Sequence, residues 1–551
     1  FVILGLLFAK GPRYQGKRHT VLGPVSIAAL ILIGLPITTQ AAQSSNILAS
    51  YFANIAQGYS DYGFVYGFST SVVGRGMDKP EDYSEETVDA INTLVDSASS
   101  PTTVSTGSEP NVICVLLESF CDPYEVNFLN MSEDPIPNFH NLEANYSTGY
   151  LTVPVVGAGT ANTEFEVLTG MSMQYFGTGE YPYKTILKQT DCESIADDLS
   201  QIGYGTHVVH NNTATFYSRN NAFSMMGFDT FTSKECMNIS QYTPNGNWPT
   251  DDVLVQETVK AMNATENQSD FVYTITVEGH GDYPTEKILE NPDILVSGAA
   301  DEASNNQWEY YVNMIHEVDD FIGDLITAVD RRGEDTIIVF FGDHLPTMGL
   351  TDADMKSGDI FKTKYITWNN MGLAKKDADL TAYQLLAHIT DQAGIHEGTM
   401  FRYHQSEMNA GVSTDDASYL TNWKLLQYDL LYGDRYSYHG VDKYPASDLV
   451  MGVQDVVIDH TSMNTDETKL TLFGKNFTPW SKVYIDGEKV STEYISGNCL
   501  EISMADLKAG SQIVVNQVGS SNTIFRSSNT ITFNAPADFN EHDADNVEVP
   551  D

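Results

Sequence analysis

The chain has 551 residues, which is too long for a single compact core and predicts two or more domains. Its 74 acidic residues against 29 basic ones give a net charge of −45. This balance argues against nucleic acid as a partner, because phosphate binding requires clustered lysine and arginine. The five cysteines are too few and too scattered for a disulfide framework, although the sequence leaves a Cys192–Cys236 bridge open.

The first 42 residues predict a membrane segment. A basic stretch with Lys10, Arg13, Lys17 and Arg18 precedes an uncharged apolar run of 17 residues at 21–37. That length is at the lower limit for a transmembrane helix, and the positive-inside rule places the basic stretch in the cytoplasm. A secretory signal peptide is the alternative, since a basic region, an apolar core and "TTQAA" also fit that pattern. Both interpretations place everything after about residue 42 outside the cytoplasm.

We favour the membrane helix because the apolar piece "FVILGLLFA" already precedes the basic stretch. The chain starts with Phe1 rather than Met, so we expect it to be a fragment of a longer protein with an unknown number of membrane helices upstream.

The rest of the chain divides into four segments that differ in composition and in hydrophobic pattern. Residues 43–105 end in "SASSPTTVSTGSEP" and are expected to be an extracellular linker. Residues 106–445 alternate apolar strand-like runs with helix-like segments, which predicts an α/β domain with a mainly parallel central sheet. Residues 451–536 consist of short alternating strands with an Asp-Gly turn, as is typical of a small β-sandwich. Residues 537–551 are acidic and poor in apolar groups, so we expect a disordered tail.

Four apolar runs in the α/β region end on residues that bind metals or exchange protons. "VICVLLE" ends at Glu118, "THVVH" at His210, "FVYTITVEGH" at His280, and "TIIVFFGDH" at Asp343 and His344. Continuous apolar runs are typical of parallel strands buried on both faces. Since ligands bind at the carboxyl ends of such strands, we expect these side chains to converge on one edge of the sheet.

The stretch "VPVVGAGTANTEFEVLTGM" predicts a helix that begins near Thr160. A hydroxyl at a helix N-terminus lies among free N–H groups and suits a phosphate or sulfate, although an ordinary helix cap is the alternative. With Glu118, Asp343 and His344 it forms a hard oxygen and nitrogen set suited to Mn²⁺, Mg²⁺ or Zn²⁺. A divalent ion beside Thr160 would lower the pKa of its hydroxyl and make it a nucleophile.

Three further residues are candidates for substrate binding. The planar guanidinium of Arg219 suits bidentate contact with phosphate, and a surface salt bridge is the alternative. His280 lies between two glycines and could protonate a leaving alkoxide, since its ordinary pKa is near neutral. His210 has the weakest case, because a lone histidine is often a structural residue.

Five motifs, in this order, resemble the extracellular domain of the lipoteichoic acid synthase family: "ESF", "GAGTANTEF", "HNNTATFYSRNNAF", "EGHGDYP" and "FFGDHLP". That family consists of phosphoglycerol transferases of the alkaline phosphatase and sulfatase superfamily, and the resemblance covers roughly residues 20–430. It implies that Thr160 is the nucleophile and that one Mn²⁺-type ion is bound by Glu118, Thr160, Asp343 and His344. It also implies that the phosphoglycerol head group contacts His210, Arg219 and His280.

Three local features qualify this resemblance. Tyr217 stands where the family often has a tryptophan, so the shape of the head-group pocket can differ. "CDPYE" at Cys121 copies the first half of the sulfatase C-x-P-x-R motif, but Glu125 replaces the arginine, so we do not expect sulfate ester hydrolysis. "LTLFGKNFTPWSKVYIDG" resembles the IPT/TIG family of immunoglobulin-like domains.

The sequence therefore predicts a membrane-anchored phosphoglycerol transferase whose catalytic domain is extracellular, on a cell of the Gram-positive type. It would move glycerol phosphate from phosphatidylglycerol to a glycolipid or a growing polyglycerolphosphate chain. One alternative is a metal-dependent hydrolase that uses the same site. The other is an inactive cell-surface protein that binds through the β-sandwich, for which contact with a cell-wall polymer rests on analogy of fold alone.

Overall fold

The computed structural model describes residues 76–98, 109–265, 267–464 and 468–534, together with the single positions 38 and 63. The predicted membrane helix at 21–37 and the tail at 537–551 lie outside these residues. Within the described ranges, no helix has both the length and the apolar content needed to cross a bilayer. The chain divides into two compact units, and the fold described below belongs to the larger, Asp78–Met173 with Tyr181–Asp551.

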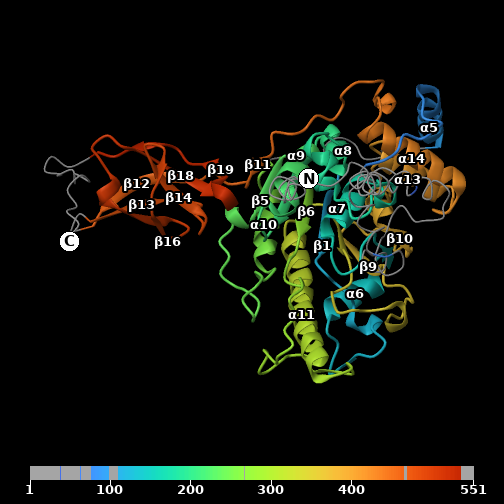
Figure 1. The fold of residues 1–551 in the computed structure, drawn as a ribbon, viewed down its shortest axis with the longest axis horizontal. Helices are drawn as coiled ribbons and strands as arrows, with labels where there is room; N and C mark the ends of the chain where they lie inside the picture. The colour runs from blue at the N-terminus through green and yellow to red at the C-terminus, as the bar shows by residue number, and fades with distance from the viewer. Residues whose placement is uncertain are drawn as a thin grey trace, which may run out of the picture. The chain divides into compact units, whose positions relative to one another are not determined.

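A nine-stranded sheet forms the centre of this unit, in the order β10-β3-β9-β8-β1-β6-β4-β5-β11 (Figure 1). Strand β9 is antiparallel to both β8 and β3, and all other neighbours are parallel. Every residue of β1 and β8 is buried, as expected for strands covered on both faces. The predicted α/β core with a mainly parallel sheet is therefore confirmed. The strands are β1 (Asn111–Leu117), β3 (Thr148–Thr152), β4 (Gly205–His210), β5 (Thr230–Ser233), β6 (Asp270–Ile275), β8 (Thr336–Gly342), β9 (Lys362–Asn369), β10 (Leu380–Thr381) and β11 (Val450–Met451).

Helices pack on both faces of the sheet. On one face, helices α6, α10 and α11 share a hydrophobic core with alternate residues of the strands, such as Ile113 of β1 and Phe340 of β8. On the other face, Phe223 of α9 packs edge-on against Phe231 and Tyr273. The helices are α5 (Glu85–Ala98), α6 (Pro137–Asn145), α7 (Thr160–Thr169), α8 (Ile195–Gln201), α9 (Arg219–Met225), α10 (Val253–Met262), α11 (Glu302–Asp330), α12 (Leu385–Gln392), α13 (Met400–Asn409) and α14 (Ala417–Leu431).

Helix α5 lies inside segment 43–105, which the sequence indicated to be a linker. It buries Val88, Ile91 and Val95, whose spacing of three and four residues places them on one helix face. The Ser/Thr/Pro-rich end of the segment suggested a linker, but an earlier part of the same segment forms a helix with a buried face.

The C-terminal strands form two antiparallel sheets, β12-β13-β17-β16 and β15-β14-β18-β19 with β20 beside β18. Leu472 and Leu500 of the first sheet share a core with Val483 and Val515 of the second, so residues 457–532 form a β-sandwich. Its likeness to immunoglobulin-like domains stays a prediction. The strands are β12 (Val457–Met463), β13 (Lys469–Lys475), β14 (Ser481–Ile485), β15 (Glu488–Lys489), β16 (Thr492–Ser496), β17 (Cys499–Ser503), β18 (Gln512–Val518), β19 (Ile524–Ser527) and β20 (Ile531–Thr532).

Two smaller features complete the description. Strands β2 (Asn130–Met131) and β7 (Val296–Ser297) form a short antiparallel pair outside the main sheet. All five cysteines are free thiols, so Cys192 and Cys236 do not form the bridge that the sequence left open.

Candidate metal centre

The carboxyl ends of β4, β6, β1 and β8 meet at one edge of the sheet, because these strands are neighbours and parallel. Glu118 follows β1 directly, and Asp343 and His344 follow β8. These three residues are buried, and each offers one ligand atom within 4.8 Å of the other two. The structure thus brings together the carboxylates and the imidazole that the ends of the apolar runs indicated.

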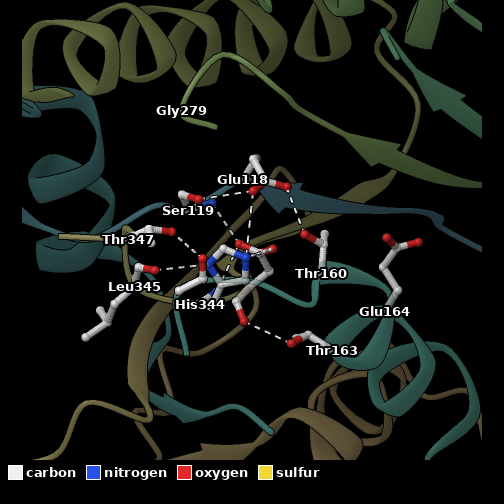
Figure 2. A network of polar contacts seen from close by, with 12 residues as sticks. Glu118, Ser119, Thr160, Thr163, Glu164, Gly279, His344, Leu345 and Thr347 are labelled. Carbon is white, nitrogen blue, oxygen red and sulfur yellow. Dashed lines mark hydrogen bonds and ion pairs between the residues drawn. The ribbon is translucent and has the colours of Figure 1, made fainter. Parts of the chain in front are cut away.

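Thr160 joins this group from helix α7. Its Oγ1 donates a hydrogen bond of 3.1 Å to Oε2 of Glu118 (Figure 2). The N-cap of α7 is Gly159, with a φ of 108°, and Thr160 is already the first helical residue. A side chain at 159 would be strained at this φ, so glycine allows the chain to turn into the helix. The hydroxyl of Thr160 therefore faces the acidic cluster instead of capping its own helix.

Ser119 holds the two carboxylates in place, and sequence reasoning did not single it out. Its backbone N–H donates to Oδ1 of Asp343 at 2.8 Å, and its hydroxyl donates to Oε1 of Glu118 at 3.0 Å. The N–H of His344 donates to the same Oδ1 of Asp343 at 2.9 Å. Ser119 has a φ of 53°, a strained conformation for a residue with a side chain, and such strain is typical of functional sites. The only sequence signal was its position directly after Glu118.

A close backbone approach fixes the loop after β6 to this site. A Cβ at Gly279 would lie 2.3 Å from the carbonyl oxygen of Glu118. Only glycine allows that approach, so the loop that carries His280 lies directly against the backbone of a proposed ligand.

The electrostatics of the cluster favour a bound cation. Burial and the neighbouring Glu118 raise the pKa of Asp343 to about 7. Burial alone would lower the pKa of His344, but Asp343 and Glu118 raise it overall. Oδ2 of Asp343 is buried without a hydrogen-bond partner in the described part of the chain, and Nε2 of His344 lies 3.3 Å from it. Two carboxylates that repel each other, with an imidazole and a hydroxyl beside them, fit the donor set of a divalent metal ion.

His210, the last residue of β4, lies next to Arg219. Its Nδ1 is 2.9 Å from the carbonyl oxygen of Ile275, so this nitrogen carries the proton and donates. The opposite nitrogen, Nε2, then accepts from Nη1 of Arg219 at 3.3 Å. Burial and the charge of Arg219 lower the pKa of His210 well below its usual value. In this structure His210 is therefore a neutral residue that contacts the arginine.

Arg219 is buried, with 2% of its surface exposed, so the surface salt bridge considered from the sequence does not describe it. Its Nε and Nη2 donate to Oε1 of Glu164 at 3.1 and 2.5 Å. Burial opposes the charge of Arg219, but Glu164 raises its pKa above the usual value. Glu164 is the second residue of this site that sequence reasoning missed, although it lies within the "GTANTEF" motif.

Tyr217 lies beside this arginine, and the guanidinium carbon of Arg219 is 5.2 Å from the centre of its ring. The ammonium group of Lys184 lies 4.5 Å from the same ring. Tyr217 and Ser218 have φ values of 55° and 63° in succession, so the backbone is strained where it turns into α9.

His280 lies on a loop and not at a strand end, which differs from the sequence prediction. Strand β6 ends at Ile275, because the carboxylate of Asp251 accepts the N–H groups of Val277 at 2.9 Å and Glu278 at 3.2 Å. These backbone donors are then not available to a neighbouring strand. The ring of His280 packs against Trp248, with centroids 4.3 Å apart.

Comparison with known proteins adds family and fold to this geometry. A family model described as Sulfatase matches residues 110–423. A putative cyclic β-1,2-glucan modification protein of Rhizobium meliloti is 27% identical over 418 residues, which cover 69% of this chain and 63% of that protein. A lipoteichoic acid synthase of Staphylococcus saprophyticus is 23% identical over 242 residues, which cover 42% of this chain and 35% of that protein. The chain thus spans less than two thirds of the length of both relatives.

Among solved structures, the phosphoglycerol transferase GacH of Streptococcus pyogenes, in complex with sn-glycerol-1-phosphate, has a TM-score of 0.58. It is 21% identical, and the match covers 68% of this chain and 100% of that chain. At this level of identity the likeness establishes a shared fold.

Proposed function

Because this chain belongs to the sulfatase family, whose model matches residues 110–423, we propose that it is a metal-dependent phosphoglycerol transferase. The observation that carries the proposal is the contact of 3.1 Å between the hydroxyl of Thr160 and Glu118, beside Asp343 and His344. A hydroxyl aimed into a set of metal-type ligands is the arrangement that an activated nucleophile requires.

Glu118, Thr160, Asp343 and His344 would hold one divalent ion, with Mn²⁺ the first choice and Mg²⁺ or Zn²⁺ the alternatives. Such an ion, when bound, neutralises charge on the phosphoryl group and lowers the pKa of a nearby hydroxyl. The phosphoryl oxygens would contact Arg219 and Tyr217 on the other side of Thr160.

In the first step, Oγ1 of Thr160 attacks the phosphorus of phosphatidylglycerol and forms a new P–O bond. The bond from phosphorus to the diacylglycerol oxygen breaks, and His280 supplies the proton that this alkoxide takes up. The threonine proton passes to the carboxylate of Glu118, which already accepts its hydrogen bond. Glycerol phosphate is then bound covalently to Thr160.

In the second step, a hydroxyl of the acceptor attacks the same phosphorus, the bond from phosphorus to Oγ1 of Thr160 breaks, and this oxygen takes back the proton held by Glu118. His280 takes the proton of that hydroxyl, in reverse of its first role. We propose a glycolipid or a growing polyglycerolphosphate chain as the acceptor. The Rhizobium meliloti relative, whose match covers 69% of this chain, is named for the modification of a glucan, which supports a sugar hydroxyl in this role.

The location follows from the donor, which is a membrane lipid. We propose that segment 1–42 anchors the protein, that the catalytic region works outside the cytoplasm of a Gram-positive type cell, and that the β-sandwich contacts a wall polymer. The names of the solved phosphoglycerol transferase and of the lipoteichoic acid synthase support glycerol phosphate as the group that is transferred.

Intact-mass analysis tests the covalent step. The protein is incubated with phosphatidylglycerol and Mn²⁺, and an added mass of roughly 154 Da is expected on the wild type but not on Thr160→Ala. Thr169→Ala is the matched control, because Thr169 is a buried threonine of the same helix whose hydroxyl donates to the carbonyl of Phe165. A similar adduct on Thr160→Ala would disprove the assignment of the nucleophile.

Product analysis then separates transfer from the rival hydrolysis. Growth of the acceptor supports transfer, whereas free glycerol phosphate as the only product would make the protein a hydrolase with the same site.

A further inference from the structure

We propose that Glu164 is a positioning residue that fixes Arg219 and cancels its charge, so that the site favours phosphodiesters over phosphomonoesters. This inference rests on the proposed function, because it takes Arg219 to contact the phosphoryl group. It assigns a role to a buried acid that neither metal binding nor proton transfer requires.

The contacts of Glu164 are directed almost entirely at Arg219. Its carboxylate has no exposed surface and accepts two N–H groups of the guanidinium, at 3.1 Å from Nε and 2.5 Å from Nη2. The hydroxyl of Tyr183 donates to the other oxygen at 3.4 Å. With His210 on Nη1 at 3.3 Å, the guanidinium is fixed on two sides, and the remaining N–H groups of Nη1 and Nη2 are left for a ligand.

Helix α7 links this arginine to the nucleophile. Thr160 and Glu164 are four residues apart on α7, so they lie one above the other on the same face. Figure 2 shows both side chains on the same side of the helix, with Thr160 directed at Glu118. All ten residues of α7 are buried, so the packed helix fixes the position of Arg219 relative to the attacking oxygen.

Charge decides which esters this arrangement favours. The carboxylates of Glu118 and Asp343 balance a divalent ion, and Glu164 balances Arg219, so these groups leave no excess positive charge. A phosphodiester carries one negative charge, whereas a phosphomonoester carries nearly two at neutral pH, since its second pKa is about 6. Lys184 is the nearest further cation in the contacts of Tyr217, but its side chain is exposed and is screened by solvent. In the proposed mechanism the proton of His280 goes to the leaving oxygen, so the second charge of a monoester has no fixed partner among these groups.

The test compares two esters of one leaving group. Cleavage of bis(p-nitrophenyl) phosphate and of p-nitrophenyl phosphate by the full chain is measured with Mn²⁺ at pH 8. Glu164→Gln keeps the size of the side chain and a carbonyl oxygen for Arg219 but removes the negative charge. We expect the ratio of kcat/KM for the monoester to that for the diester to rise roughly tenfold, because one added charge acts on two substrate charges instead of one.

Two further variants separate charge from position. Glu164→Asp keeps the charge on a shorter side chain, so we expect both rates to fall about tenfold with the ratio unchanged. Glu166→Gln is the matched control: Glu166 is another buried acid of α7, but it accepts from Met173 N–H at 2.8 Å and from Ser172 instead of Arg219. Burial raises the pKa of Glu166 to about 8, so an amide resembles its protonated form and should leave both rates unchanged.

Binding without turnover gives an independent readout. Calorimetric titration of the Mn²⁺-loaded protein with inorganic phosphate and with dimethyl phosphate should show the same shift towards the doubly charged anion in Glu164→Gln. An unchanged preference in both experiments overturns the inference, and so does a Glu164→Asp protein with wild-type rates. If Glu164→Gln does not fold, the two rates of Glu164→Asp alone test the inference. A wild type that cleaves neither ester overturns both the inference and the proposed function. If the wild type does cleave them, an unchanged preference in Glu164→Gln overturns the inference alone.

Discussion

Two acidic clusters include residues that follow strand β1, Glu118 in one and Asp122 in the other, within five residues of each other. The negative charge of each cluster is balanced in a different way. The first is the candidate metal centre, where Glu118 and Asp343 lie together with His344, the hydroxyl of Thr160 and Ser119, and the described residues place no lysine or arginine in an ion pair with either carboxylate. The second, which we call the lysine cluster, consists of Asp122, Glu125, Glu143 and Lys364. The ammonium of Lys364 lies 3.0, 3.2 and 3.0 Å from the three carboxylates.

The difference appears in the acidity of the carboxyl groups. Burial raises the pKa of both Asp122 and Asp343, but His140 and Lys364 bring the pKa of Asp122 below its usual value. Asp343 has Glu118 as a neighbour instead, and its pKa rises to about 7. In a buried acidic cluster that contains a lysine, the protein itself balances the negative charge. A cluster without such a basic side chain favours the binding of a metal ion. Four predictions test this comparison.

The largest effect is expected for Asp343→Asn. This change replaces a charged metal ligand by a neutral amide while keeping an oxygen that can accept from Ser119, and a metal ion contributes several kcal/mol to phosphoryl transfer. We expect Mn²⁺-dependent diester cleavage to fall by at least about a thousandfold. A variant of Asp343 that kept wild-type activity with Mn²⁺ would mean that the first cluster is structural, like the second.

The next largest effect is expected for Lys364→Met, which removes the cation of the lysine cluster. Three neighbouring carboxylates are then left without it, and the free energy of unfolding should fall by about 3 kcal/mol. Denaturation in urea measures this loss. Lys356→Met, which removes an exposed lysine, is the control and should change stability by less than about 0.5 kcal/mol. Tight Mn²⁺ binding by Lys364→Met is also expected, since its metal ligands are intact.

Addition of Mn²⁺ should raise the free energy of unfolding only when the ligands of the candidate metal centre are intact. At a Mn²⁺ concentration of one hundred times the Kd, the wild type should gain about 2.7 kcal/mol over the protein with chelator. Lys364→Met should show the same gain, and Asp343→Asn should show little. Equal stabilisation of all three proteins would place the ion elsewhere.

The smallest effect concerns His140, which lies 3.5 Å from Asp122 and 2.8 Å from Asp134. Burial lowers the pKa of His140, but the two aspartates raise it overall to about 9. Its stabilising contribution is then full below the unfolded pKa of about 6.5 and is lost as the pH rises through about 9. His140→Asn should lower stability by less than about 2 kcal/mol at pH 6 and by almost nothing at pH 10. The same loss at both pH values would show that packing, not charge, is responsible.

The sequence predicted the sheet and the clustering of Glu118, Asp343 and His344 because both depend on local patterns. The apolar run before Glu118 and the one before Asp343 are strands β1 and β8, and parallel neighbours bring their ends together whatever the rest of the chain does. Thr160 was predictable for a similar reason, since a helix begins where the small residues end.

The residues that were missed depend on tertiary contacts. Glu164 has no local signal, because its partner Arg219 is 55 positions away and reaches it only after α9 has packed. Ser119 acts through its backbone N–H, which every residue other than proline has, and through a hydroxyl whose acceptor, Glu118, is identified only by the structure. The end of β6 was misplaced because the carboxylate of Asp251, from a distant segment, takes the backbone donors that a longer strand would use.

Helix α7 carries Thr160 and Glu164 four residues apart and is buried along its whole length. Each residue advances an α-helix by roughly 100° of rotation. Insertion or deletion of one residue between these two would therefore turn the acid away from Arg219 while Thr160 kept its place. We expect related proteins that share this chemistry to vary in the loops around the helix and in its neighbours, but to keep the number of residues between these two positions.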